Sequence, residues 1–207
     1  MSAKAALSAG LAALGFSLDA EAQERLVAYL ALIEKWNRVY NLTAVRDTEQ
    51  MVPQHLLDSL AVAPHLRGNT LLDVGSGAGL PGLPLALARP ETWVTLIESS
   101  HKKSAFLKQA AMELALPNVE VVNARVETWD APRTYDVVVS RAFSDLAEFA
   151  TLAGRHVAPG GVLVAMKGVH PYEELAQLPP PYRMTAVIPL EVPGLAAQRH
   201  LVLMERA

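Results

Sequence analysis

The chain has 207 residues, of which 51% are hydrophobic and 19% charged, a composition that supports a folded core and excludes global disorder. It contains no cysteine, which excludes disulfide frameworks, cysteine–zinc sites, iron–sulfur clusters and cysteine nucleophiles. The formal net charge is -3, from 18 Lys and Arg against 21 Asp and Glu. A chain with this balance is not a general polyanion binder, so any contact with nucleic acid requires a local basic patch.

Residues 1–66 are predicted to be helical. The first helix, Ala3–Leu14, is rich in Ala and Leu. The second and third helices carry apolar residues at helical spacing, and the third runs to about His65. Candidate N-caps are Ser17 or Asp19 for the second helix and Asp47 or Thr48 for the third. We expect these helices to form an extension packed on a main domain of residues 67–207.

From Asn69 onward, short apolar runs alternate with helical patterns, which predicts βαβ units and a mostly parallel sheet. The predicted strands are Thr70–Val74, Thr92–Ile97, Val119–Val122, Tyr135–Val139 and Gly161–Met166. The predicted helices between them are Gly82–Ala88, Lys102–Leu116 and Ser144–His156. After a stiff linker at 179–181, two closing strands are predicted at Met184–Val192 and His200–Arg206, with an antiparallel arrangement left open.

A glycine-rich loop follows the first predicted strand. Asp73 ends the strand, and Gly75, Gly77 and Gly79 follow at alternate positions. Glycine permits positive φ and lets a ligand touch the backbone at the carboxyl end of the strand. The dinucleotide pattern GxGxxG fails because Leu80 stands where its third glycine belongs, and Asp73 would repel a diphosphate. The acid suits the ammonium and sulfonium of S-adenosylmethionine, and D-x-G-x-G-x-G resembles the first motif of class I methyltransferases.

Three further residues are candidates to contact that cofactor. Glu98 ends the second strand, where a carboxylate binds ribose hydroxyls in Rossmann-like folds. Its alternative role is to cap the helix that begins near His101. Val126 and Glu127 follow the third strand, in the loop that lies along the adenine in methyltransferases, so a similar fold would bring them to the adenine ring and its polar edge. A solvated surface position is the alternative for Glu127.

The fourth strand ends in Ser140 and is followed by Arg141, Ala142 and Phe143 rather than the Asn/Asp-Pro-Pro-aromatic string of amino-group methyltransferases. The absence of cysteine excludes the covalent route to cytosine C5. The absence of both the Asn/Asp-Pro-Pro-aromatic string and cysteine fits an acceptor atom that has no proton to lose. Guanine N7 is such an acceptor, because its lone pair needs only alignment with the methyl group. Arg141 is predicted to orient substrate or cofactor, with an ion pair to Asp136 or Asp145 as its alternative.

Several strings together are far more specific than the glycine loop. They are WNxxYNLT at 36–43, HxxDS at 55–59, DVGSGAGLPG at 73–82, SRA at 140–142, Lys167-Gly168 and Arg199-His200. This set resembles the RsmG (GidB) family of bacterial 16S ribosomal RNA methyltransferases over essentially the whole chain. The resemblance implies a Rossmann-like class I methyltransferase fold with a seven-stranded sheet. It also implies methyl transfer from S-adenosylmethionine to N7 of a guanine in the 530 loop of 16S rRNA, and streptomycin resistance on loss of activity.

The resemblance also assigns residues. Expected cofactor contacts are Asp73, Gly75, Gly77, Gly79, Leu80, Glu98, Val126, Glu127 and Arg141. Residues expected to orient the substrate, without any general base, are His55, Arg125, Arg141, Lys167 and Arg199. Residues expected to contact RNA are Lys102, Lys103, Arg125, Lys167 and Arg199. No metal is expected, because His55 and Asp58 on one helix face offer too few ligands; a hydrogen bond between them, or His55 reaching the active site, is expected instead.

The predicted partner is 16S rRNA or the 30S subunit, bound by a cytoplasmic, monomeric enzyme without a membrane span. The basic residues named above would form a rim at the carboxyl edge of the sheet, although each alone is also an ordinary solvated side chain. Trp36, Tyr40 and Phe143 are candidates to stack on a base, with core packing as the alternative for the first two. Two other functions stay open: methylation of another RNA position, a protein or a small molecule, and non-catalytic ribosome binding.

Overall fold

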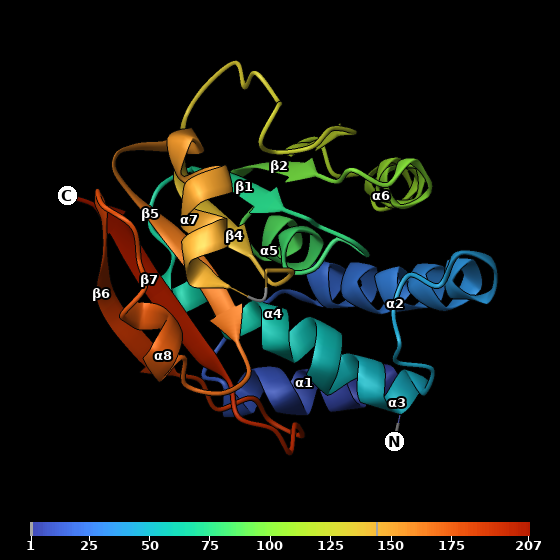
Figure 1. Ribbon diagram of the computed structural model, residues 1–207. Helices are drawn as coiled ribbons and strands as arrows, with labels where there is room; N and C mark the ends of the chain where they lie inside the picture. Colours follow the sequence, from blue (N-terminus) through green and yellow to red (C-terminus); the bar gives the residue numbers. More distant parts are fainter. Residues whose placement is uncertain (1, 144) are drawn as a thin grey trace.

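The computed structural model describes residues 2–143 and 145–207, and its centre is a seven-stranded sheet with helices on both faces (Figure 1). The strand order is β3-β2-β1-β4-β5-β7-β6, in which β7 runs antiparallel to β5 and β6 and the other neighbours are parallel. The strands are β1 Thr70–Val74, β2 Trp93–Ile97, β3 Val119–Val122, β4 Tyr135–Ser140, β5 Val157–Lys167, β6 Tyr182–Pro189 and β7 His200–Arg206. This topology confirms the predicted Rossmann-like class and settles the closing strands as antiparallel.

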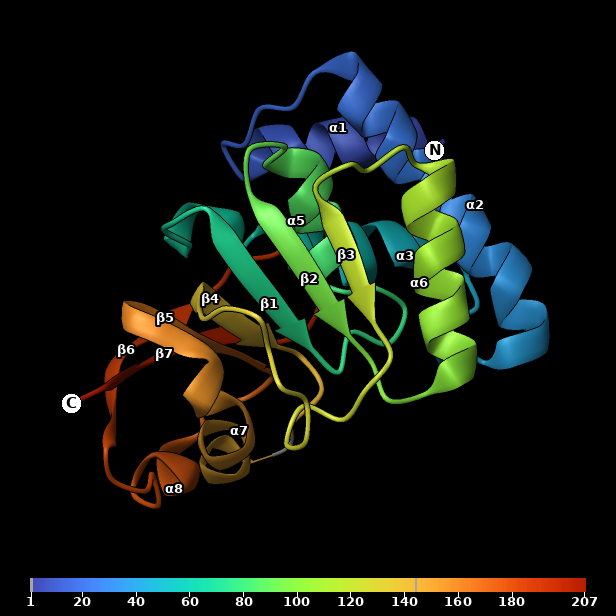
Figure 2. The same cartoon turned by 90° about the horizontal axis from the view of Figure 1, so that it is seen from above.

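The helices divide between the two faces of the sheet (Figure 2). One face packs against the N-terminal helices, α5 and α6, and the other against α7. Successive β-strand residues point to opposite faces, so Leu71 joins the first core and Leu72 the second, and both are buried. The described helices are α1 Ala3–Ala13, α2 Ala20–Tyr40, α3 Thr48–Met51, η1 Val52–Leu57, α4 Asp58–Leu60, η2 Ala63–His65, α5 Gly82–Ala88, α6 His101–Glu113, α7 Leu146–Ala153, η3 Gly154–His156 and α8 Tyr172–Leu175.

The N-terminal helices share one core with the sheet. Asp19 caps α2 and Asp47 caps α3, which selects one residue from each predicted pair. From α2, the buried Tyr29 hydroxyl donates to the carbonyl of Ala78 in the glycine loop, and Arg25 donates to the carbonyl of Ala115 behind α6. The extension therefore supports the glycine loop directly, while a domain division at residue 67 stays a prediction.

Several segments differ from the sequence-based expectation, among them β6, which spans Tyr182–Pro189 instead of the predicted Met184–Val192. The third predicted helix is broken into α3, the π-helical η1 and α4, whereas apolar spacing indicates only a continuous helix. Strand β5 begins at Val157, four residues early, because Tyr135 pairs with Val157 before the register shifts. Position 144, the predicted start of the helix that becomes α7, lies outside the described residues. None of the described helices is long and apolar enough to cross a membrane.

Gly10 of α1 packs against Leu57 of η1, and replacing this glycine with Ala should destabilise the fold. An added Cβ would lie 2.2 Å from Cδ1 of Leu57. We expect Gly10→Ala to lower the free energy of unfolding by about 1–3 kcal/mol, measured by urea denaturation. The control is Gly168→Ala, whose Cβ would have no neighbour within 4 Å. Equal stability of both variants would contradict this packing.

Candidate functional site

The glycine loop turns sharply at the carboxyl end of β1. Gly75 and Gly77 have φ values of +69° and +58°, so both adopt the left-handed conformation that favours glycine. The backbone N–H groups of Gly75 and Ser76 both donate to the carbonyl of Ile97, at 2.9 and 3.2 Å, which fixes the loop to β2. Gly75 is exposed, whereas Gly79 is buried, and a Cβ there would meet Leu83 at 2.5 Å. Gly75 therefore offers its backbone to a ligand, and Gly79 serves packing.

Asp73 lies beneath this loop rather than beside a pocket. Its side chain is fully buried, and Oδ2 accepts a 2.9 Å hydrogen bond from the backbone N–H of Gly82 at the start of α5. Burial raises the pKa of this carboxyl to about 7, with the hydrogen bond from Gly82 and the charge of Arg141 acting in the opposite direction. The carboxylate thus joins β1 to α5, and its contact with a cationic ligand stays a prediction.

Glu98 connects the glycine loop to the start of α6. Its Oε2 accepts from the backbone N–H of Gly77 at 2.9 Å, and its Oε1 accepts from that of Ser100, the N-cap residue of α6, at 2.8 Å. The side chain is buried at the end of β2. The structure therefore gives Glu98 the helix-start contact that we considered as its alternative role, and the ribose contact stays a prediction beside it.

A first pocket, here called the cofactor pocket, opens where β1, β2 and β4 end. It has a volume of about 230 Å³, and three of the predicted cofactor residues line it, namely Gly75, Val126 and Glu127. Ala142 and Phe143, which follow β4, close another side. The loop glycine matters here, because a Cβ on Gly75 would approach that of Ala142 to 3.0 Å. The predicted residues Gly77, Gly79 and Leu80 shape the loop beside the pocket and are absent from its described lining.

A second pocket of about 350 Å³, here called the acceptor pocket, lies where β4 and β5 end and η1 approaches the sheet. It brings together four of the five side chains predicted to orient the substrate, which are His55, Arg141, Lys167 and Arg199. These residues come from four segments far apart in the sequence. Their assembly indicates that the motifs at 55–59, 140–142, 167–168 and 199–200 form one site.

Asp58 holds two of these cations in place. Its carboxylate is completely buried; Oδ2 lies 3.2 Å from Arg141 Nη1, and Oδ1 lies 2.9 Å from Arg199 Nε. The alternatives considered for Arg141 are therefore wrong, because its partner is neither Asp136 nor Asp145. Asp136 lies at the opposite end of β4, where it accepts hydrogen bonds from the residues that begin β1.

His55 faces the acceptor pocket as a neutral ring. Its Nε2 lies 3.1 Å from Oγ1 of Thr43, the last residue of the WNxxYNLT string. The carboxylate of Asp58 binds Arg141 and Arg199 instead, so the expected hydrogen bond between His55 and Asp58 is not formed. Burial and the neighbouring charge of Arg141 lower the pKa of His55 to about 4. At neutral pH the ring therefore adds no charge to the pocket.

Lys167 is the third cation of the acceptor pocket. Its Nζ donates to Oε2 of Glu174 at 2.8 Å, and its side chain is only 10% exposed. Glu174, in α8, also accepts from the backbone N–H of Leu146 at the start of α7. Sequence reasoning missed Glu174, because nothing in its local pattern distinguishes it from an ordinary helical acid.

The two pockets meet at consecutive residues. Arg141 lines the acceptor pocket and Ala142 lines the cofactor pocket. The two pockets are therefore neighbours on either side of the chain that leaves β4. Ser140, just before them, donates from Oγ to the carbonyl of Val74 and accepts from the backbone N–H of Ala142, which ties this turn to β1. A group held in one pocket is therefore placed next to a group held in the other.

The remaining predicted RNA contacts lie outside the acceptor pocket. Arg125 lines the cofactor pocket instead, with a side chain 73% exposed and an ion pair to Glu127 at 3.0 Å. Lys102 and Lys103 stand in the first turn of α6, where the helix dipole disfavours cations. Trp36 packs on the buried Phe106, with ring centres 5.6 Å apart, which supports core packing as its role.

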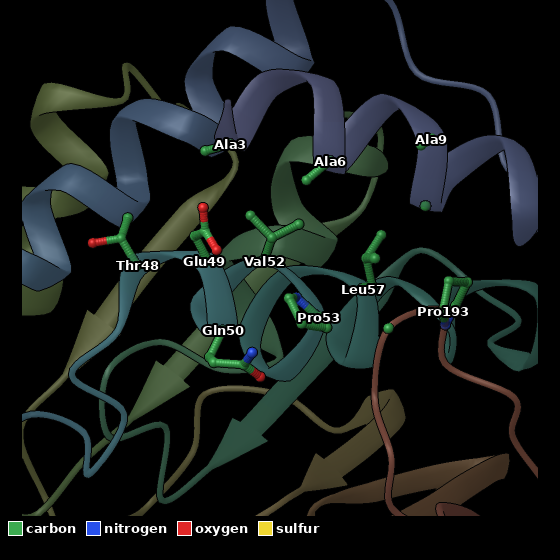
Figure 3. Close-up of a pocket in the computed structure, with 12 residues that line it drawn as sticks. Ala3, Ala6, Ala9, Thr48, Glu49, Gln50, Val52, Pro53, Leu57 and Pro193 are labelled. Carbon is green, nitrogen blue, oxygen red and sulfur yellow. The ribbon is translucent and has the colours of Figure 1, made fainter. Parts of the chain in front are cut away.

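A separate cavity of about 570 Å³ lies between α1 and η1 (Figure 3). Val52, Pro53 and Leu57 line it, whereas Gln54 and His55 of the same helical segment line the acceptor pocket. Its lining is mainly apolar and small, without the convergent charges of the acceptor pocket. Within the described part of the chain, no group of three potential ligands is arranged to hold a metal ion.

The sheet, the glycine loop and the two adjoining pockets define a class I methyltransferase, the class that takes its methyl group from S-adenosylmethionine. Solved structures support the fold. The O-methyltransferase TomG from Streptomyces achromogenes, in complex with SAM, matches with a TM-score of 0.59 at 20% identity, over 86% of this chain and 89% of that chain. The glycopeptide N-methyltransferase MtfA complexed with SAM matches with a TM-score of 0.60 at 14% identity, over 74% and 87% of the two chains.

Sequence comparison identifies the family. The model described as "GidB: rRNA small subunit methyltransferase G" matches residues 22–202. A "Ribosomal RNA small subunit methyltransferase G" from Nitrosospira multiformis is 56% identical over 97% of this chain and 96% of its own length. The protein of that name from Neisseria meningitidis serogroup C is 49% identical over the full length of both chains. The chain belongs to the GidB family, which confirms the resemblance identified from its motifs.

Proposed function

We propose that this enzyme transfers a methyl group from S-adenosylmethionine to N7 of a guanine in the 530 loop of 16S rRNA. The observation that carries the proposal is the chemistry of the acceptor pocket. Its lining combines three cations with one buried carboxylate, and both oxygens of that carboxylate are engaged by arginines. A pocket of this kind suits an acceptor on a polyanion that needs no proton removed.

The residues around the cofactor pocket fit S-adenosylmethionine. Gly75 exposes its backbone to the pocket, and a side chain at this position would reduce the space for a ligand. Val126 offers an apolar surface for adenine, and Glu127 offers a hydrogen-bond acceptor for the adenine amino group. When bound, the cofactor supplies a methyl group on a sulfonium. Ala142 and the neighbouring Arg141 would then align the acceptor base with that methyl, and alignment is the main requirement of an in-line transfer.

Guanine N7 fits because its lone pair attacks without losing a proton. The arginine N–H groups of Arg141 and Arg199 can donate to O6 and to phosphate oxygens while N7 stays free. Methylation leaves positive charge on the guanine ring, and the ion pairs of Asp58 and Glu174 with the three cations limit the net positive charge that this ring would meet in the pocket. His55, neutral at neutral pH, adds no repulsion.

The substrate proposal also accounts for the net charge of -3. Three cations are concentrated in one pocket, and Lys102, Lys103 and Arg125 add positive charge along the carboxyl edge of the sheet. Local cations bind phosphates, whereas an acidic remainder disfavours indiscriminate RNA binding. The relatives' names, which specify small-subunit rRNA, support this assignment.

The direct test is transfer of a labelled methyl group from S-adenosylmethionine to 30S subunits and 16S rRNA from a strain that lacks the family enzyme. We expect label in 16S rRNA. Label confined to protein or small molecules would favour a methyltransferase with that other kind of substrate. Binding of S-adenosylmethionine without any methyl transfer would favour a non-catalytic ribosome-binding protein.

His55→Gln should distinguish orientation from base catalysis. Gln can keep a hydrogen bond to Thr43 but has no ring nitrogen to accept a proton. We expect kcat to fall by less than about tenfold, because the proposed transfer needs no general base. Loss of a general base typically lowers kcat by about 100-fold to 10,000-fold. Steady-state kinetics on 30S subunits measures this, and a fall in the larger range would identify His55 as the base and contradict the proposed mechanism.

A further inference from the structure

We propose that a third pocket, directly beside the acceptor pocket, binds an unpaired nucleobase next to the methylated guanosine by stacking it on Tyr172. This inference rests on the proposed rRNA substrate. The pocket, here called the stacking pocket, has a volume of about 560 Å³ and lies where β5 and β6 end and β7 begins. Its functional lining is Val169, His170, Tyr172, Gln198, Arg199 and His200.

The rings of this pocket form a preorganised stack. Tyr172 lies on His170 with ring centres 3.8 Å apart and an interplanar angle of 25°. His200 meets His170 edge-on, with centres 5.4 Å apart, and the Nδ1 of His200 lies 3.1 Å from the carbonyl oxygen of Gly168. The Tyr172 ring is therefore supported on one face by His170, and His170 in turn contacts the hydrogen-bonded ring of His200.

The outer surface of this stack is open to solvent. Tyr172 is 75% exposed and Val169 is 72% exposed, which makes them the two most exposed large apolar side chains among the described residues. An aromatic ring that packs on protein with one face and is exposed to solvent can stack on a base, because every nucleobase presents a π-face. The exposed amide of Gln198 can donate to or accept from a base edge.

Arg199 connects the stacking pocket to the acceptor pocket, since its side chain lines both. Nε of Arg199 donates to Asp58 and Nη1 donates to the carbonyl of Gln198, so the remaining guanidinium N–H groups can donate to a phosphate. One phosphate separates adjacent nucleotides. A guanosine in the acceptor pocket and its neighbour in the stacking pocket would therefore place their shared phosphate near Arg199.

The three pockets follow one another along the carboxyl edge of the sheet. The cofactor pocket lies at the ends of β1, β2 and β4, the acceptor pocket at β4 and β5, and the stacking pocket at β5, β6 and β7. Together, rings, a cation and an amide favour single-stranded RNA as the occupant over a protein segment.

The test combines Tyr172→Ala with removal of single bases from the RNA. The substrate is 16S rRNA assembled by ligation so that each nucleotide flanking the target guanosine is replaced, one at a time, by an abasic nucleotide, used free and reconstituted into 30S subunits. We expect one abasic substitution to raise the KM or Kd of the wild type by roughly tenfold, as loss of one stacked base does. Tyr172→Ala should show the same loss with intact RNA and little further loss with that abasic RNA.

Two variants separate stacking from a structural effect. Tyr172→Phe keeps the ring and should bind intact RNA as the wild type does. Met112→Ala removes another highly exposed apolar side chain, on α6 away from the three pockets, and should have no effect.

The proposal would be overturned if the losses of affinity caused by Tyr172→Ala and by each abasic substitution simply added for every flanking nucleotide. A loss seen only on 30S subunits and not on free rRNA would also overturn it, because that loss would indicate a protein contact. Wild-type enzyme that methylates guanine N7 in 16S rRNA while Tyr172→Ala binds normally would contradict only the stacking pocket. Failure of the wild type to methylate 16S rRNA would instead contradict the proposed function.

Discussion

Replacing Asp58 with Ala should be among the most damaging single changes to this enzyme. The change removes a completely buried carboxylate and leaves the guanidinium groups of Arg141 and Arg199, whose side chains are 29% and 25% exposed, without their shared partner. Breaking a buried ion pair from one side costs about 3–5 kcal/mol of stability. Because both arginines line the acceptor pocket, we also expect kcat/KM for 30S subunits to fall by about 100-fold or more.

The matched control is Asp136→Ala. Asp136 also accepts several hydrogen bonds, from the backbone of Asn69 and from the backbone and hydroxyl of Thr70, but it lies at the opposite end of β4. It should lose stability in urea denaturation and keep the activity of its folded fraction. If Asp58→Ala retained wild-type kcat/KM below its unfolding temperature, Asp58 would have no role in positioning the two arginines.

Gly75→Asp should abolish cofactor binding while the protein stays folded. Position 75 has a φ of +69° and opens onto the cofactor pocket, where a Cβ would lie 3.0 Å from that of Ala142. Aspartate adds bulk and a carboxylate where the backbone is expected to meet the cofactor. We expect titration calorimetry with S-adenosylmethionine to show binding weakened by about 100-fold or more, since both a contact and the available volume are lost.

Gly160→Asp controls for backbone strain, because Gly160 has a similar φ of +76° and a Cβ there would have no neighbour within 4 Å. It should lose comparable stability and bind the cofactor normally. Wild-type affinity in Gly75→Asp would exclude this loop from the cofactor site, whereas equal loss of affinity in both variants would assign the effect to strain.

Most of the sheet was predictable because most of its strands are local sequence patterns. Strands β1, β3 and β7 have the predicted bounds, since apolar runs bounded by turn residues define them. The early start of β5 was not predictable, because Pro159 and Gly160 indicate a turn while tertiary pairing extends the strand through them. The π-helical form of η1 likewise depends on packing that no local spacing encodes.

The candidate site was predictable in its members but not in its connections. His55, Arg141, Lys167 and Arg199 stand in recognisable strings, and the structure assembles them. The ion pairs of Asp58 join residues 83 and 141 positions apart, so no spacing rule could have indicated them. The family resemblance groups Arg125 with the acceptor residues, whereas its position after β3 places it beside the cofactor pocket.

The most direct test of the central proposal, a base-free transfer to guanine N7, replaces the acceptor atom itself. 30S subunits are reconstituted with 16S rRNA in which the target guanosine is 7-deazaguanosine, which keeps O6, N1 and N2 but has carbon at position 7. Unsubstituted subunits should yield labelled 7-methylguanosine on nucleoside mass analysis, and the substituted subunits should bind the enzyme and accept no methyl group. Labelled methyl on the 7-deazaguanosine subunits, or any labelled nucleoside other than 7-methylguanosine, would contradict the account.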